Sequence, residues 1–171
     1  MYAGNLGELR ELVFILKELC NDEEMMQYVY NRDTEDPTHV ALPVDKTGYD
    51  LLMYENVFPY LKIIDLDEDV NIYLCVYFGK SINSGGTADY KDNLLFVDVY
   101  VHQSLWKIDS GIRTNEILIR IDTLLNDKKI ENVTEPFSYV SLRALPSPNP
   151  RYAGFGLMYH KVDSGTKNRY E

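Results

Sequence analysis

Leu94-Leu-Phe-Val-Asp-Val-Tyr-Val-His-Gln103 is the stretch that decides the fold, because its side chains alternate between the two faces of a β-strand. The wholly apolar face carries Leu95, Val97, Val99 and Val101. The other face is mixed and carries Phe96, Asp98, Tyr100 and His102. A strand with one apolar face is half-buried, so the sequence predicts a sheet whose apolar face is covered by a second layer.

Four more segments have the composition of strands, namely 60–65, 71–79, 137–145 and 153–162. In segment 71–79, Ile72, Leu74, Val76 and Phe78 share one face, and Tyr73, Cys75 and Tyr77 share the other. We expect this strand and 94–103 to pair as a hairpin. Its extended tip, residues 81–93, is rich in Ser, Gly and Asn and is predicted to be an exposed, flexible loop.

The last two strands are separated by Pro-Ser-Pro-Asn-Pro at 146–150. Each proline blocks a helix and removes a hydrogen-bond donor, so this connection is predicted to be extended. Within the final strand, Gly154 and Gly156 indicate a bulge or a close approach of another backbone.

Three segments have helical periodicity. The first, 5–20, repeats apolar residues at steps of three and four: Leu6, Leu9, Val13, Leu16 and Cys20. A second, shorter helix is predicted from 22 to 31, with Asn21 as its N-cap and Glu24 as the capping-box partner. The third ends at 126, begins at a cap provided by Ser110 or Thr114, and pairs Glu116 with Arg120 on its surface.

The order of these elements predicts one α+β domain over residues 1–171. Its sheet is mainly antiparallel, with an N-terminal helix or helix pair and one central amphipathic helix packed on one face. Residues 32–56 are polar and interrupted by Pro37, Pro43 and Gly48, which predicts a long irregular connection. The polar tail, 163–171, is predicted to be flexible.

Composition narrows the classes of function. The net charge is −10 and there is no basic run, so the chain lacks the clustered cations of a nonspecific nucleic-acid binder. Cys20 and Cys75 lie far apart in apolar segments, which predicts buried free thiols in a reducing compartment. No apolar run approaches the length of a membrane span, so we expect no membrane association.

The sequence contains little that points to catalysis. His39, His102 and His160 are scattered, and none has a second His or Cys at metal-ligand spacing. The acidic run 65–69 begins like a calcium loop, but Val70 stands where that loop needs Gly. We therefore predict no catalytic residue, cofactor or metal. An enzyme with a site around Asp98, Tyr100 and His102 stays open as an alternative, as does an acidic module that binds a basic partner in the manner of an immunity protein.

One stretch resembles a known family. The run from Asn93 to Gln103, the turn Asp109-Ser-Gly-Ile-Arg113 and the helix 114–126 are similar to the central unit of tail-terminator (tail-completion) proteins of tailed bacteriophages. The N-terminal helices, strand 60–65 and the final hairpin follow the same order. The long 32–56 connection and the proline-rich 146–150 segment depart from a minimal terminator, which leaves another neck role open, such as a stopper or connector adaptor.

The resemblance implies a structural subunit of the virion that is assembled in the host cytoplasm. It implies a homo-oligomeric ring, commonly of six subunits, that caps the tail tube and joins it to the head connector, without a cofactor or catalysis. DNA would only pass through the lumen of such a ring, and an acidic lumen would repel it.

Several side chains are candidates for the contacts of such a ring. Arg113 is either an interface arginine or a residue at the helix start that pairs with Asp109 or Asp122. The aromatic residues of the strands either meet another subunit or pack on the sheet. The strand candidates are Tyr73, Tyr77, Tyr100 and His102, and the candidates in the hairpin tip are Ser84, Gly85, Gly86 and Tyr90.

Overall fold

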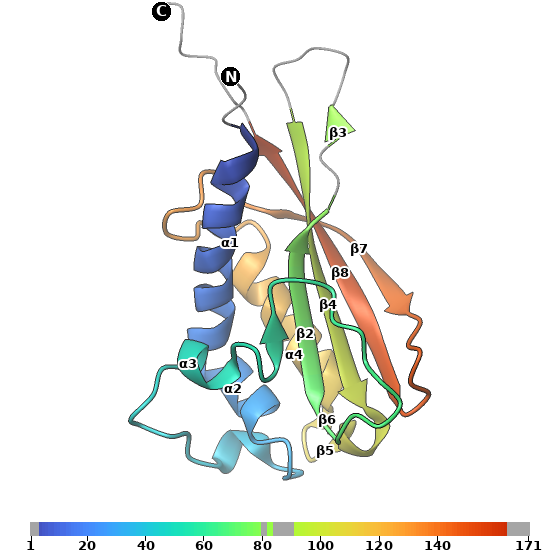
Figure 1. Ribbon diagram of the computed structural model, residues 1–171. Helices are drawn as coiled ribbons and strands as arrows, with labels where there is room; N and C mark the ends of the chain where they lie inside the picture. The colour runs from blue at the N-terminus through green and yellow to red at the C-terminus, as the bar shows by residue number, and fades with distance from the viewer. Residues whose placement is uncertain (1–3, 80–81, 84–90, 164–171) are drawn as a thin grey trace, which may run out of the picture.

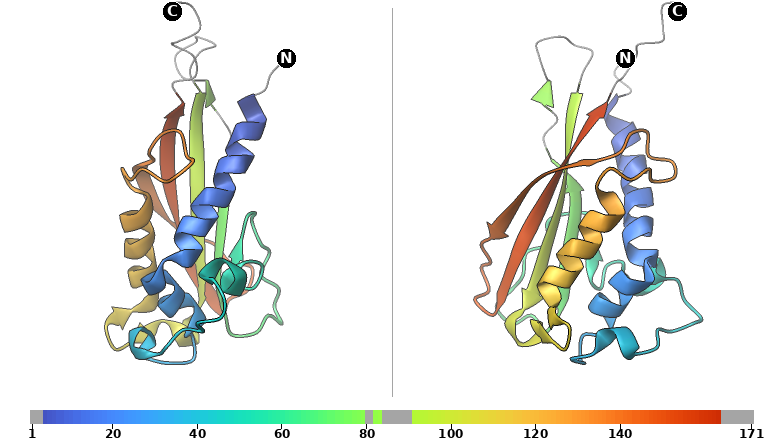
Figure 2. Two further views of the ribbon diagram at one scale, coloured as in Figure 1. Left: turned by 90° about the vertical axis from the view of Figure 1, so that its left-hand side faces the viewer. Right: turned by 180° about the vertical axis from the view of Figure 1, so that it is seen from behind.

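A sheet covered on one face by helices makes up the protein (Figures 1 and 2). The computed structural model describes residues 4–79, 82–83 and 91–163. The helices are α1 (Gly4–Asn21), α2 (Glu23–Tyr30), η1 (Pro37–His39, a 3₁₀ turn), α3 (Gly48–Leu52), η2 (Gln103–Leu105, also 3₁₀) and α4 (Arg113–Leu125). The strands of the main sheet are β1 (Val57–Phe58), β2 (Ile72–Phe78), β3 (Ile82–Asn83), β4 (Lys91–His102), β7 (Ser138–Leu145) and β8 (Tyr152–Asp163).

The strands of the main sheet lie in the order β1-β2-β4-β8-β7, and β3 pairs with one end of β4. All of these pairs are antiparallel except β1 with β2. A separate two-stranded ribbon is formed by β5 (Lys107–Ile108) and β6 (Gly111–Ile112). The predicted α+β class, with a mainly antiparallel sheet and helices on one face, is therefore confirmed.

The alternating stretch 94–103 occupies the centre of the sheet. Its apolar row is wholly buried beneath the helices, since Leu95, Val97, Val99 and Val101 are each 0% exposed. On the next strand, Gly154 lies so close to β4 that an added Cβ would be 2.1 Å from the carbonyl oxygen of Val99. The predicted close backbone approach is therefore present, and glycine is required there.

Ionic and polar contacts join the helices to one another and to the sheet. Arg120 of α4 donates from Nε to Asp22 at 2.7 Å and also pairs with Glu24 at 3.1 Å. On α1, Glu11 accepts hydrogen bonds from Thr134 and from the buried Lys161 of β8. The predicted pairing of Arg120 with Glu116 is wrong, because the acidic first turn of α2 lies against α4.

The ends of two helices differ from the prediction. The N-cap of α2 is Asp22, not Asn21, and its carboxylate accepts from the N–H of Met25 at 2.9 Å. Neither Ser110 nor Thr114 caps α4, which begins after Ile112 without a side-chain cap. The N–H of Arg113 instead donates to the carbonyl of Trp106 at 2.8 Å, because the β5–β6 ribbon brings that carbonyl to the start of the helix.

Two further predictions fail in the region before β2. The 32–56 connection is not wholly irregular, because Thr47 caps α3 and Gly48 fits against the carbonyl of Cys20. Segment 60–65 is not a strand of the sheet. The parallel strand β1 ends at Phe58, and Pro59 follows, which has no N–H to continue the pairing. Of the predicted hairpin tip and tail, residues 84–90 and 164–171 lie outside the described residues.

Candidate interaction surface

The outer face of the sheet, away from the helices, is crossed by residues 59–71, here called the strap (Figure 1). Beneath the strap lies a second core of buried side chains: Phe58, Ile64, Tyr73, Cys75, Tyr100 and Tyr152. The rings of Tyr73 and Tyr152 stack with centroids 5.6 Å apart. Tyr73 and Tyr100, which were candidates for a subunit interface, are only 3% and 7% exposed, so they pack internally instead.

Glu68 holds the strap to the sheet. Its carboxylate accepts a hydrogen bond from the hydroxyl of Tyr73 at 2.6 Å and another from the ammonium of Lys62. Lys62 also lies 4.7 Å from the centroid of the Tyr73 ring. The hydrogen bond from Lys62, together with that from Tyr73, lowers the pKa of Glu68 below its ordinary value.

This lowered pKa gives a testable dependence of stability on pH. Because the folded protein favours the charged form of Glu68, its stabilising effect is present above the ordinary pKa of 4.5 and is lost as the pH falls through the lowered value. We expect Glu68→Gln to remove this pH-dependent contribution to the stability. Urea denaturation between neutral pH and pH of about 3 should show a stability difference that shrinks as the pH falls. If the difference in stability between the two proteins did not change with pH, the Glu68 carboxylate would not make these contacts.

A polar cluster occupies the uncovered part of the outer face. The hydroxyl of Tyr77 donates to Asp98 at 2.8 Å, and the guanidinium of Arg143 donates to the same carboxylate at 3.3 Å. Arg143 also lies over the ring of Phe96, 5.2 Å from its centroid. Asp98 is 1% exposed, whereas half of the Arg143 side chain is open to solvent. Of the three predicted interface tyrosines that the structure describes, Tyr77 is therefore the one at the edge of an accessible region.

His102 lies apart from this cluster, at the end of β4. Its Nδ1 contacts the hydroxyl of Ser104 at 2.7 Å, and its ring meets the edge of the Tyr152 ring at 5.2 Å. Burial, with the charge of Arg151, lowers the pKa of His102. Within the described part of the chain, the polar contacts of Asp98 and His102 involve different partners. Burial, and after it the charge of Asp98, raises the pKa of Tyr100, so Asp98 and Tyr100 lie close together while His102 has its own contacts.

Arg113 is a structural residue inside the fold, and the prediction of an interface arginine is wrong. Its side chain is 1% exposed and donates to five backbone carbonyls. These carbonyls belong to Tyr28, Asn31, Arg32, Thr34 and Leu105. Its predicted pairing with Asp109 or Asp122 is also wrong, since its guanidinium is directed at the carboxyl end of α2. Burial lowers the pKa of Arg113.

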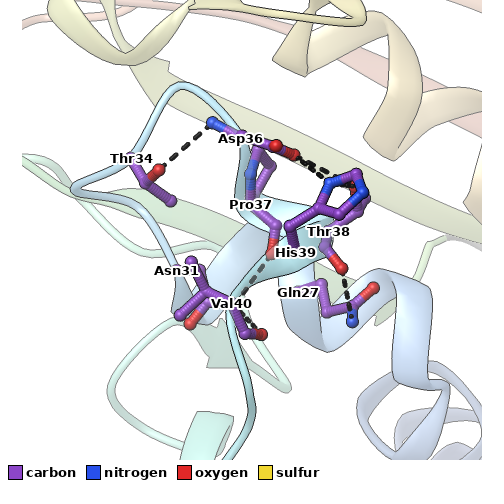
Figure 3. A network of polar contacts seen from close by, with 8 residues as sticks. All are labelled: Gln27, Asn31, Thr34, Asp36, Pro37, Thr38, His39 and Val40. Atoms are coloured by element: carbon purple, nitrogen blue, oxygen red, sulfur yellow. Dashed lines mark hydrogen bonds and ion pairs between the residues drawn. The ribbon is translucent and has the colours of Figure 1, made fainter.

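The turn after α2, whose carbonyls accept from Arg113, is also held by its own hydrogen bonds (Figure 3). The side-chain amide of Asn31 donates to the carbonyls of Pro37 at 2.9 Å and Val40 at 3.1 Å. Gln27 donates to the carbonyl of Thr38 at 3.1 Å. These contacts make residues 31–40 a fixed turn, and a cleft of about 500 Å³ lies between this turn and the start of β2.

Among the described residues, no group of three or more His, Cys, Asp or Glu side chains is arranged to hold a metal ion, in that cleft or elsewhere. Searched over the same residues, the helices include none long and apolar enough to cross a membrane.

Both cysteines are free and buried, as the sequence predicted. Burial raises the pKa of Cys20 to about 12 and that of Cys75 to about 11. Because the thiolate is the reactive form, we expect neither thiol to react with a soluble thiol reagent in the native protein at neutral pH. Both should react in denaturant. Rapid labelling of either thiol without unfolding would show that its site opens to solvent.

An unpaired strand forms the far edge of the sheet. No residue of β7 is buried, and in the described part of the chain β8 is the only strand that pairs with it. Tyr139, Val140 and Leu142 are 45%, 46% and 49% exposed. The first residues of β7 are tied to Asn126 and Asp127, so the free part is residues 140–145, here called the β7 edge.

The β7 edge lies in the longest part of the sequence without an acidic residue. Residues 136–162 contain no Asp or Glu, although the chain has 27 of them. They carry Arg143, Arg151 and Lys161, of which Lys161 is buried in its pair with Glu11. An edge with exposed apolar side chains and positive local charge thus stands on a strongly acidic molecule. Sequence reasoning missed this edge because it depends on the order of strands in the sheet.

The comparison with protein families gives a match. The family model named YomW matches residues 18–161, from the end of α1 into β8. The chain belongs to the YomW family. YomW is the name of a protein from a Bacillus phage region, which relates the YomW family to phages. Comparison with curated proteins gives no match.

Proposed function

We propose that this chain is a structural subunit of the phage neck, a tail terminator that forms a ring, caps the tail tube and joins it to the head connector. The observation that carries the proposal is the unpaired β7 edge with its exposed apolar side chains. The phage relation of the YomW family and the resemblance to tail terminators support the same role.

The energetics of the edge favour association. A free strand presents unpaired N–H and C=O groups to any strand that can align with it. Soluble proteins usually protect such an edge with lysine, proline or a covering helix. On the β7 edge the exposed side chains include Val140 and Leu142 instead, with Arg143 as the one charge. Pairing with another chain would bury these side chains and satisfy the strand's backbone.

The ring would have about six copies by the resemblance, with the tail tube protein on one side and the head connector on the other. A net charge of −10 on each subunit suits a lumen through which DNA passes without binding. The proposed role needs no cofactor or catalysis. Its place is the neck of the virion, after assembly in the host cytoplasm.

Negative-stain imaging of tail tubes tests this role. Tubes assembled from the tail tube protein of the same phage would be mixed with the purified chain, and with a matched sample that lacks it. We expect ring-shaped density at one tube end and an arrest of tube growth. Binding to the isolated head connector, with no effect on tubes, would instead indicate a stopper or adaptor. A tight one-to-one complex with a basic partner would favour the acidic binding module.

A further inference from the structure

Residues 60–64 of the strap form a segment without backbone-to-backbone hydrogen bonds to any described residue, and the carbonyl of Asp65 that follows accepts from the N–H of Glu68 and the amide of Asn149. The N–H of Lys62 meets only the sulfur of Cys75, at 3.3 Å. Exposed polar backbone of this kind in a β-rich sequence is ready to pair with another strand.

The side chains of this segment alternate like those of a strand. Leu61 and Ile63 are 55% and 73% exposed, whereas Ile64 is 2% exposed and packs in the second core. Lys62 lies over the Tyr73 ring beneath the strap. Leu61 and Ile63 are therefore an apolar pair that faces away from their own molecule. The sequence pattern of a strand at 60–65 has no strand partner within the described chain.

The strap and the β7 edge are complementary in charge. The strap carries four acidic residues, Asp65, Asp67, Glu68 and Asp69. The β7 edge instead carries Arg143 and lies in the acid-free part of the chain, 136–162. Two acidic copies repel each other over most of their surfaces, so a contact between them is favoured where an acidic segment meets one that has no acidic residues.

We infer that residues 60–65 of one copy add to the β7 edge of the next copy as an extra strand. This inference rests on the proposed ring and names the surfaces that close it. The strap and the β7 edge are different surfaces, so each contact is head-to-tail, and repetition of the same contact generates a ring when the rotation between copies closes. Leu61 and Ile63 pack beside Val140 and Leu142, and the acidic turn 65–69 lies near Arg143.

Cysteine cross-linking of the full-length chain tests the contact directly. Four double variants combine Leu61→Cys or Ile63→Cys with Val140→Cys or Leu142→Cys. Each position on the strap is thus paired with each position on β7, so that different registers of the two strands can be detected. The native thiols are buried and do not interfere. After a mild oxidant is added, we expect at least one double variant to give a ladder of covalent multimers on a denaturing gel. A control, Ile63→Cys with Ile119→Cys, places the second thiol on a more exposed apolar site of α4 and should give no ladder.

The outcomes separate this inference from the proposed function. If native mass spectrometry shows a ring but none of the four double variants cross-links, the ring uses other surfaces and the inference fails alone. A dimer from the single variant Leu142→Cys would show pairing of β7 with β7 and would also overturn it. A chain that stays monomeric with and without the tail tube protein would overturn the proposed ring itself.

Discussion

Replacement of Arg113 by alanine is expected to lower the free energy of unfolding by about 3–5 kcal/mol, the largest effect of any single substitution considered for this protein. The guanidinium is buried and donates to carbonyls that end α2 and form the turn after it. Without it, these carbonyls lose their partner away from water, and a cavity remains where the side chain stood.

Urea denaturation followed by circular dichroism measures this change. Arg113→Lys should recover only part of the stability, because an ammonium cannot reach carbonyls on several sides at once. Arg10→Ala removes an exposed arginine from α1 and is the matched control, with a change expected within about 0.5 kcal/mol. If Arg113→Ala and Arg10→Ala unfolded at the same urea concentration, the buried guanidinium of Arg113 would not stabilise the turn after α2.

Leu142→Glu is expected to abolish association of the subunits while the monomer stays folded. Leu142 is 49% exposed in the single chain, so the substitution costs the fold little. In the proposed contact it would remove a buried apolar side chain and place a carboxylate beside the acidic strap. We expect a loss of about 3 kcal/mol per contact, or roughly a hundredfold in affinity.

Analytical ultracentrifugation of the variant and the parent chain checks this expectation, with thermal unfolding as the test of folding. Ile119→Glu is the control, because Ile119 is 62% exposed on α4, away from the β7 edge. It should associate like the parent chain. A Leu142→Glu chain that still forms the full assembly would remove the β7 edge from the interface.

The part of the fold that could be predicted is the part that hydrophobic periodicity determines. The alternation in 94–103 correctly gave a central strand with a buried face, and the repeats in the N-terminal and central segments gave the helices α1 and α4. The predicted stripe of α1 was partly wrong, because Val13 is 39% exposed while Leu12, Ile15 and Leu19 are buried. These patterns are local, and burial of one face is enough to explain them. Helix ends were less predictable, since the N–H at the start of α4 is satisfied by a carbonyl of the β5–β6 ribbon.

The candidate surface was harder to predict, because it also depends on contacts between distant parts of the chain. Tyr73 and Tyr100 lie on the face expected for them, but the strap covers that face. Apart from Pro59, no residue pattern indicates that a segment leaves the sheet there. Four of the five carbonyls that Arg113 contacts lie about 80 residues away, such as that of Tyr28, and no pattern of side chains records them. The β7 edge depends on which strand ends the sheet, and this is a property of the topology.

The strap also explains why segment 60–65 looked like a strand. Its alternating side chains have strand character, and Ile64 packs against the sheet as a strand residue would. What it lacks in the single chain is a backbone partner. The proposed contact between copies supplies one, so the sequence pattern and the unpaired geometry have one physical cause.

The central claim is that this chain acts by joining copies of itself through its surfaces. Native mass spectrometry of the full chain, over a range of concentrations and with and without the tail tube protein, tests it most directly. We expect one discrete closed assembly of about six subunits, formed by the chain alone or on addition of the tube protein. A monomer under every one of these conditions, or an open-ended series of masses, would contradict it.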